Sequence, residues 1–321
     1  MEFVKIKMKK KAIIVSIKGF TLTKREKLLF LNENPWGLIL FSRNIKSLRQ
    51  INTLIKNVKK ITKNNTFPIL IDEEGSAVSR LRNIIHHDFS SKYFGDLFLV
   101  NKKICTKIYL KYLESICKIL KNIGINTNTI PVLDILRKTT SKVIGERSFS
   151  NKKEIVKELG KITVKQCHKN KIICVMKHIP GHGCANVDSH HITPKVNLSK
   201  SELSSTDFFP FKINSVKLAM TAHVLYKKID SKNVATFSNK IIKKIIRKEI
   251  GFKGILMSDD ISMKALKFDL ITNAKRSLEA GCNLVLYCAG DINDNFKLIK
   301  SVPYIDKFTS KKTSEIYKIL R

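Results

Sequence analysis

The sequence predicts an α/β fold, a single (β/α)₈ TIM-type barrel formed by residues 1–321. Short apolar runs alternate along the chain with lysine-rich amphipathic stretches, the pattern of parallel strands buried on both faces and covered by helices. Ionisable residues directly follow several of these runs, where barrels of this type place their binding sites. The length suits one barrel, which usually needs about 250 residues plus insertions.

Eight apolar runs are expected to form the barrel strands. They lie at residues 12–17, 37–41, 67–71, 125–130, 172–176, 217–221, 254–258 and 283–287. Eight such units favour a closed barrel over an open doubly wound sheet, which stays the alternative. Since no Pro-rich or Gly/Ser-rich linker and no solenoid-length repeat divides the sequence, we expect one domain.

One helix is predicted by its own start and stop signals. Ser238 is a suitable N-cap before the isoleucine-rich segment at residues 239–250, and Gly251 follows at the expected end. This helix should lead into the strand that ends at Asp259.

The charge and composition narrow the classes of function. The net charge is +35, but lysines are spread over the whole chain and no arginine-rich arm is present, so we expect no nucleic-acid partner. No apolar stretch approaches the roughly 20 residues that span a membrane, and the start lacks a signal-peptide core. Seven cysteines without C-x-x-C spacing indicate free thiols in a reducing compartment. We therefore expect a cytoplasmic protein without a membrane partner.

Charged or imidazole side chains stand at the ends of four predicted strands. They are Asp72, Lys177 with His178, His223, and Asp259 with Asp260. Each alone could be a helix cap or an ordinary hydrogen-bonding residue. Together they indicate a ligand site at the barrel mouth, because burying several charges costs free energy unless they serve one another or a ligand.

The segment from Lys177 to His190 concentrates the most reactive residue types. It reads Lys-His-Ile-Pro-Gly-His-Gly at 177–183 and Asp188-Ser189-His190 shortly after. A metal site is one reading, since His178, His182, Asp188 and His190 are all ligand types. The segment lacks a metal spacing such as H-E-x-x-H and a suitably spaced cysteine, so we expect neither a metal nor an organic cofactor.

A series of segments in the same order resembles the family 3 glycoside hydrolases over nearly the whole chain. The matching segments are Gly37–Asn44, Ile71–Gly75, Pro131–Asp134, Ile144–Phe149, Lys177–Gly183, Asp188–His190, Ala222–Val224 and Ser258–Met263. Within the family, the chain looks like the single-domain bacterial β-N-acetylglucosaminidases of peptidoglycan recycling.

The resemblance implies three catalytic residues. Asp259 would be the nucleophile, His190 the acid/base and Asp188 its partner. A carboxylate can attack the anomeric carbon to give a covalent glycosyl-enzyme, while an acid on the other face protonates the departing oxygen and later activates water. Histidine replaces the usual second carboxylic acid, and an imidazole that titrates near neutral pH can perform both steps.

The resemblance also implies a set of sugar-binding residues. They are Asp72, Arg80, Arg147, Lys177 and His178. A carboxylate can accept hydrogen bonds from sugar hydroxyls, and cationic side chains donate to other sugar oxygens. For Arg147 an internal ion pair with Glu146 or Asp134 is the alternative. Asp260 is expected to be structural.

The chain departs from the family pattern after Asp72. Ser76 replaces a glycine and Ala77 an arginine. We expect Ser76 to alter a backbone position that tolerates positive φ, and Ala77 to remove a cation from the subsite.

The function implied is that of a retaining exo-β-N-acetylglucosaminidase, which removes terminal non-reducing N-acetylglucosamine from muropeptide-derived disaccharides. A β-glucosidase of the same family is the near alternative. The other alternative is a non-catalytic basic binding protein.

Overall fold

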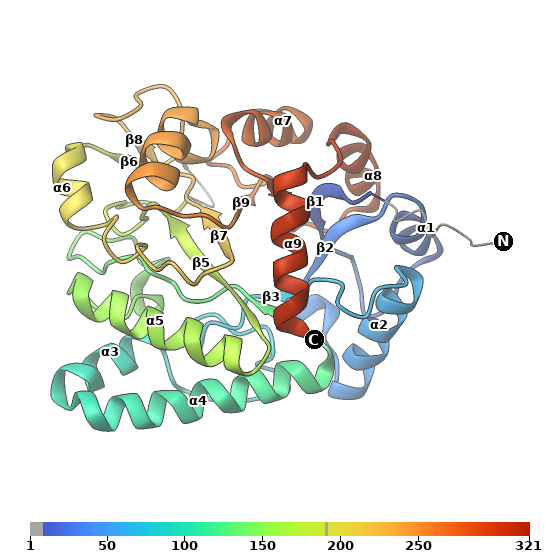
Figure 1. Ribbon diagram of the computed structural model, residues 1–321, viewed down its shortest axis with the longest axis horizontal. Coiled ribbons are helices and arrows are strands. Elements are labelled where there is room, and N and C mark those ends of the chain that lie inside the picture. The colour runs from blue at the N-terminus through green and yellow to red at the C-terminus, as the bar shows by residue number, and fades with distance from the viewer. Residues whose placement is uncertain (1–8, 190–191) are drawn as a thin grey trace.

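The computed structural model describes residues 9–189 and 192–321, which form a closed barrel of eight parallel strands surrounded by helices (Figure 1). The neighbouring order is β1-β10-β9-β7-β5-β4-β3-β2. The strands are β1 (Lys11–Val15), β2 (Pro35–Leu40), β3 (Ile69–Ile71), β4 (Thr127–Asn128), β5 (Ile173–Ile179), β7 (Leu218–Thr221), β9 (Ile255–Asp260) and β10 (Leu284–Leu286). All eight predicted strands are confirmed, and the open-sheet alternative is wrong.

Both faces of the barrel strands are buried, which explains why they read as continuous apolar runs. Alternate side chains of one strand pack into two different apolar clusters, one inside the barrel and one outside it. Ile14 packs with the side chains that fill the barrel, whereas Ile13 and Val15 pack with the surrounding layer of helices. The core is therefore a filled barrel inside a second apolar shell.

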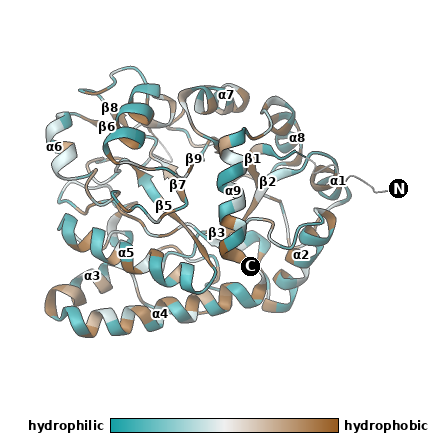
Figure 2. Cartoon of the chain, in the orientation of Figure 1, coloured by the Kyte–Doolittle hydropathy of each residue, from teal (hydrophilic) through white to brown (hydrophobic). Residues whose placement is uncertain are grey.

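Nine α-helices lie among the described residues. They are α1 (Lys24–Asn32), α2 (Leu48–Ile61), α3 (Ser91–Val100), α4 (Lys102–Ile123), α5 (Lys153–Lys169), α6 (Lys200–Ser205), α7 (Leu270–Ala280), α8 (Ile292–Ser301) and α9 (Lys307–Leu320). In α2 the buried residues Ile51, Leu54, Ile55 and Val58 form one face. Figure 2 shows hydrophilic and hydrophobic residues alternating along the outer helices, and most of their lysines are exposed. Much of the positive charge therefore lies on solvated helix surfaces.

Helix α9 covers the N-terminal end of the barrel. Ile316 packs into the cluster that fills the barrel, and the Trp36 indole donates a 2.9 Å hydrogen bond to the Thr313 hydroxyl. Trp36 is the second residue of β2, so this contact closes the end at which the strands begin. The opposite end, where the strands finish, is left for the functional site.

The helix predicted at residues 239–250 is present but is wound differently. It is a π-helix, η4 (Ile241–Glu249), and the Ile250 amide donates to the Ile245 carbonyl five residues earlier. The Ser238 hydroxyl accepts from the Ile241 amide, and Gly251 ends the helix with φ of +77°. The predicted start and stop signals are correct. An isoleucine-rich face suits an α-helix as well as a π-helix, so the sequence pattern could not distinguish the two.

A small parallel sheet was not predicted. It pairs β6 (Lys195–Val196) with β8 (Leu225–Tyr226) and connects the long segment after β5 to the segment after β7. Two-residue strands are too short to show a period in the sequence. The pairing anchors one end of the segment that carries Asp188.

Gly95 is required where α3 crosses the backbone near the site. A Cβ atom added there would lie 1.6 Å from the Phe149 carbonyl oxygen, two residues from Arg147. We expect Gly95→Ala to lower the free energy of unfolding by about 3 kcal/mol or more, because a backbone must move. Denaturant unfolding measures this, with Gly19→Ala as the control because nothing lies within 4 Å of a Cβ there. Equal stability of the two variants would contradict the prediction.

Candidate active site

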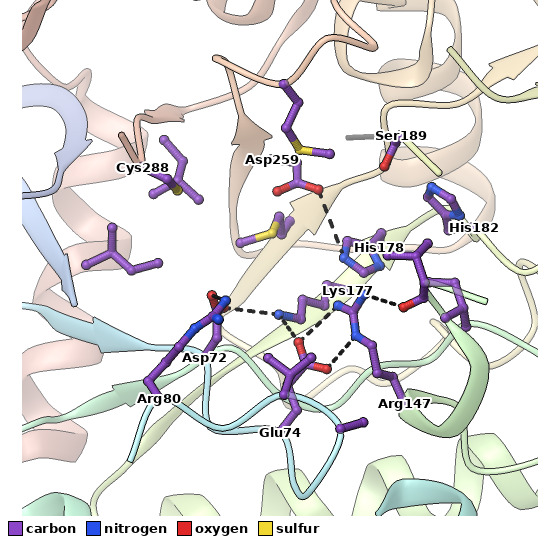
Figure 3. A pocket seen from close by; sticks show the side chains of 18 of the residues that line it. Asp72, Glu74, Arg80, Arg147, Lys177, His178, His182, Ser189, Asp259 and Cys288 are labelled. Carbon is purple, nitrogen blue, oxygen red and sulfur yellow. Dashed lines mark hydrogen bonds and ion pairs between the residues drawn. The ribbon is translucent and has the colours of Figure 1, made fainter. Parts of the chain in front are cut away.

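The carboxyl ends of the barrel strands meet around a pocket of about 520 Å³ (Figure 3). Six of the expected catalytic and sugar-binding residues line it: Asp72, Arg80, Arg147, Lys177, His178 and Asp259. They come from strands and loops far apart in sequence, and the apolar side chains of Ile39, Met220 and Leu286 complete the wall. A pocket with both polar groups and apolar surfaces suits a small ligand that is itself two-sided, such as a sugar.

The remaining predicted residues lie around this pocket or outside the described residues. Asp188 is half-buried, its carbonyl accepts from the Ile192 amide, and its neighbour Ser189 lines the pocket. His190 lies outside the described residues. His223 is fully buried and holds the β9 backbone, with Nε2 3.0 Å from the Asp260 carbonyl oxygen.

Asp259 stands near the end of β9 with its carboxylate toward the pocket. Its Oδ2 atom is 4.0 Å from His178 Nε2, and its Oδ1 atom accepts a 2.8 Å hydrogen bond from the Asp260 amide. Burial raises the pKa of Asp259, but the nearby His178 and His223 outweigh it and hold the pKa below its usual value. The carboxylate is therefore ionised at neutral pH, as a nucleophile must be.

His178 is fixed by a carboxylate that the sequence did not assign to it. Asp134 is fully buried, and its Oδ2 atom lies 2.7 Å from His178 Nδ1. Asp134 also accepts the His182 amide at 2.6 Å. Since the carboxylate accepts at Nδ1, the other ring nitrogen is turned toward Asp259. The available signal was that Asp134 follows the fourth apolar run as Asp72 follows the third.

Asp134→Asn is expected to lower kcat/KM about 10- to 100-fold, because the amide no longer fixes the His178 ring as a carboxylate does. Steady-state kinetics on a β-N-acetylglucosaminide would measure it. Asp207→Asn is the matched control, since Asp207 is an equally buried carboxylate that pairs with Arg137 and does not line the pocket. Wild-type kcat/KM in Asp134→Asn, or an equal loss in both variants, would contradict this role.

Asp72 is held between two cations at one end of the pocket. Its Oδ2 atom lies 2.9 Å from Arg80 Nη2, and its Oδ1 atom lies 3.2 Å from Lys177 Nζ. The Thr129 hydroxyl donates to the same Oδ1 atom. Burial raises the pKa of Asp72, but Lys177 and Arg80 outweigh it and hold the pKa far below its usual value. Asp72 is thus a permanent hydrogen-bond acceptor in the pocket wall.

Glu74 joins Lys177 to Arg147 and was missed in the sequence. Lys177 Nζ is 2.5 Å from Glu74 Oε1, while Arg147 donates to both Glu74 oxygens at 2.7 and 3.0 Å. Burial raises the pKa of Glu74, but the two cations outweigh it and lower the pKa to about 2. The signal was present, because Glu74 follows the same strand as Asp72.

Arg147 does form an internal ion pair, but neither expected partner takes part in it. Glu74 accepts hydrogen bonds from Arg147 Nε and Nη2. The expected ion pair therefore exists, but the expected partners, Glu146 and Asp134, are wrong. The third donor, Nη1, bonds the Val143 carbonyl at 2.9 Å. The Arg147 side chain still lines the pocket, so pairing and ligand contact can coexist.

The two departures from the family pattern have different consequences. The backbone with positive φ belongs to Gly75, at +139°, where a Cβ atom would lie 2.8 Å from the Phe89 carbonyl oxygen. Ser76 has no such φ, so the expected backbone change there is wrong. Ala77 lines the pocket, so its side chain is part of the wall and the expected loss of a cation there stays a prediction.

Two further properties concern the described parts of the chain. Within residues 9–189 and 192–321, no three His, Cys, Asp or Glu side chains are grouped to hold a metal ion. No helix in those ranges is long and apolar enough to cross a membrane.

A closed (β/α)₈ barrel with carboxylates, cations and an imidazole around a pocket at its C-terminal mouth defines a barrel enzyme that handles a polar small molecule. The model of the glycosyl hydrolase family 3 N-terminal domain matches residues 9–308. The chain belongs to this family and is a glycoside hydrolase, so the resemblance seen in the sequence is confirmed.

Curated relatives and solved structures support the same family assignment. A β-hexosaminidase from Nitrosomonas eutropha is 31% identical over 281 residues, covering 86% of this chain and 80% of the relative. A β-hexosaminidase from Neisseria gonorrhoeae is 32% identical over 282 residues, covering 86% and 77%. The crystal structure of NagZ from Neisseria gonorrhoeae with N-trifluoroacetyl-D-glucosamine superimposes with a TM-score of 0.88 at 28% identity, covering 96% of this chain and 90% of that one.

Proposed function

We propose that this glycoside hydrolase is a retaining exo-β-N-acetylglucosaminidase that removes terminal non-reducing N-acetylglucosamine from muropeptide-derived disaccharides in peptidoglycan recycling. The main support is the ionised Asp259 carboxylate, which faces a pocket whose other polar groups suit one terminal sugar. The relatives of similar length are named β-hexosaminidases, which supports the choice of sugar.

The proposed reaction has two displacements. Asp259 attacks the anomeric carbon and forms a glycosyl ester while His190, assisted by Asp188, protonates the departing oxygen. His190 then removes a proton from water, which attacks the same carbon and releases the sugar with its original configuration. The steps use side chains of the chain and water.

The sugar is proposed to bind between the acidic and basic groups of the wall. Asp72 would accept from its hydroxyls, and Arg80 and Lys177 would donate to its oxygens. His178 would complete the contact close to the reacting carbon, since its Nε2 atom is 4.0 Å from Asp259 Oδ2. Arg147 would contribute from the wall while it holds Glu74.

The first test is turnover of a chromogenic N-acetyl-β-D-glucosaminide by the full chain, beside the matched β-D-glucoside, with and without a chelator. Faster hydrolysis of the N-acetylglucosaminide, with retention of configuration followed by NMR, supports the proposal. Equal rates on both substrates would favour a β-glucosidase. No hydrolysis together with tight, steeply salt-dependent nucleic-acid binding would favour a non-catalytic binding protein.

A further inference from the structure

His182 is an exception among the buried groups of the pocket. It lines the pocket with only 3% of its surface exposed, and neither ring nitrogen has a hydrogen-bond partner among the described residues. The neighbouring His178 and His223 are both partnered, by Asp134 and by Thr236 with the Asp260 carbonyl. An unpaired buried polar group is unfavourable, so it calls for a functional reason.

The backbone holds this imidazole firmly in the wall. The His182 amide donates to Asp134 at 2.6 Å. Glycines on both sides allow the close approach of other chain segments: a Cβ at Gly181 would lie 2.9 Å from the Asp207 Cβ, and one at Gly183 would lie 2.1 Å from the Ile135 carbonyl oxygen. The ring is therefore positioned by its surroundings, although its own nitrogens form no hydrogen bond with the described residues.

The position of the ring suggests which part of a sugar it could reach. Figure 3 shows His182 on the far side of His178 from Asp72 and Arg80, beside Ser189. Its ring centroid is 5.8 Å from that of His178, which is itself close to Asp259. If Asp259 marks the anomeric carbon, the substituent on the adjacent C2 atom lies near enough to extend toward His182.

The charge state of the ring suits one kind of substituent. Burial lowers the pKa of His182 to about 4, although Asp134 opposes the shift. A neutral imidazole offers one N–H donor and one nitrogen acceptor. An acetamido group offers one N–H donor and one carbonyl acceptor, so a neutral imidazole in the suitable tautomer can pair with either of them.

We propose that His182 hydrogen-bonds the 2-acetamido group of the terminal sugar and thereby determines the preference for N-acetylglucosaminides over glucosides. This inference rests on the proposed function, because it assumes that the sugar's reacting carbon lies at Asp259. A site that hydrogen-bonds a polar substituent rejects analogues that lack it, because its own group is then left unpaired.

The test compares wild type, His182→Phe and His182→Gln on the 2,4-dinitrophenyl β-glycosides of N-acetylglucosamine and glucose, whose activated leaving group makes slow turnover measurable. In His182→Phe, kcat/KM for the N-acetylglucosaminide should fall about 10- to 100-fold while the glucoside value changes less than about threefold. His182→Gln retains a donor and an acceptor, so it should recover part of the loss. Inhibition by free N-acetylglucosamine, against free glucose, gives a second measure of the same preference.

Thermal unfolding separates this role from a structural one. Because the ligand-free enzyme loses two unpaired nitrogens in His182→Phe, its Tm should equal or exceed that of wild type. Equal losses on both glycosides, no loss on either, or a clearly lower Tm would overturn the inference. A wild type that hydrolyses neither glycoside would instead contradict the proposed function. In that case the inference about His182 is tested by binding alone, and unchanged N-acetylglucosamine binding in His182→Phe would overturn it.

Discussion

Asp259→Ala is expected to lower kcat on an N-acetyl-β-D-glucosaminide by at least about 10⁴-fold, because the proposed covalent route loses its attacking carboxylate. The carboxylate is ionised, lies in the pocket and is oriented by the Asp260 amide. Steady-state kinetics with highly purified protein would measure the loss. Added azide should restore turnover and give the α-glycosyl azide, because a small anion can attack from the side that the carboxylate vacates.

Asp260→Asn is the matched control for this prediction. Asp260 is adjacent in sequence, but its carboxylate accepts from the Ser262 hydroxyl and amide and from the Cys288 amide. Burial raises the pKa of Asp260, in contrast to Asp259. We expect a loss below about 10²-fold, since a buried hydrogen-bonding residue is altered while the proposed nucleophile is kept. Full activity in Asp259→Ala, or similar losses in both variants, would show that the nucleophile is elsewhere.

His190→Ala is expected to have the second largest effect, a loss of about 10²- to 10⁴-fold on substrates with poor leaving groups. A general acid matters most where the departing oxygen is basic, so kcat/KM on an activated dinitrophenyl glycoside should fall much less. A series of aryl N-acetylglucosaminides of rising leaving-group pKa would measure this, and a steeper dependence than in wild type is expected. Asp188→Asn should also make the dependence on leaving-group pKa steeper than in wild type, but by less than His190→Ala does.

His86→Ala serves as the control for the histidine variants, because His86 is 78% exposed in its side chain and does not line the pocket. It should keep the wild-type dependence on leaving group. If His190→Ala also kept that dependence, another residue would have to act as the acid. Exogenous azide gives a further check, because this anion can attack the glycosyl-enzyme without a general base, displacing the Asp259 carboxylate and giving the β-glycosyl azide.

The sequence by itself determined the barrel and most of the pocket residues. Strands buried on both faces are continuously apolar, so eight apolar runs could be recognised in the sequence without knowledge of the tertiary contacts. Charged residues at the ends of such runs could be assigned to one mouth, because all strands of a parallel barrel finish on the same side. Asp72, Lys177 and Asp259 were found in this way.

The tertiary structure alone decided which charges pair. Asp134 reaches His178 across 44 positions of sequence, and Glu74 reaches Arg147 across 73, and neither partner follows from local spacing. The winding of η4 and the pairing of β6 with β8 were equally hidden, because they depend on packing or on strands too short to show a period. The unpaired state of His182 could be seen only in the folded chain, since a buried group is partnered or orphaned by neighbours from other segments.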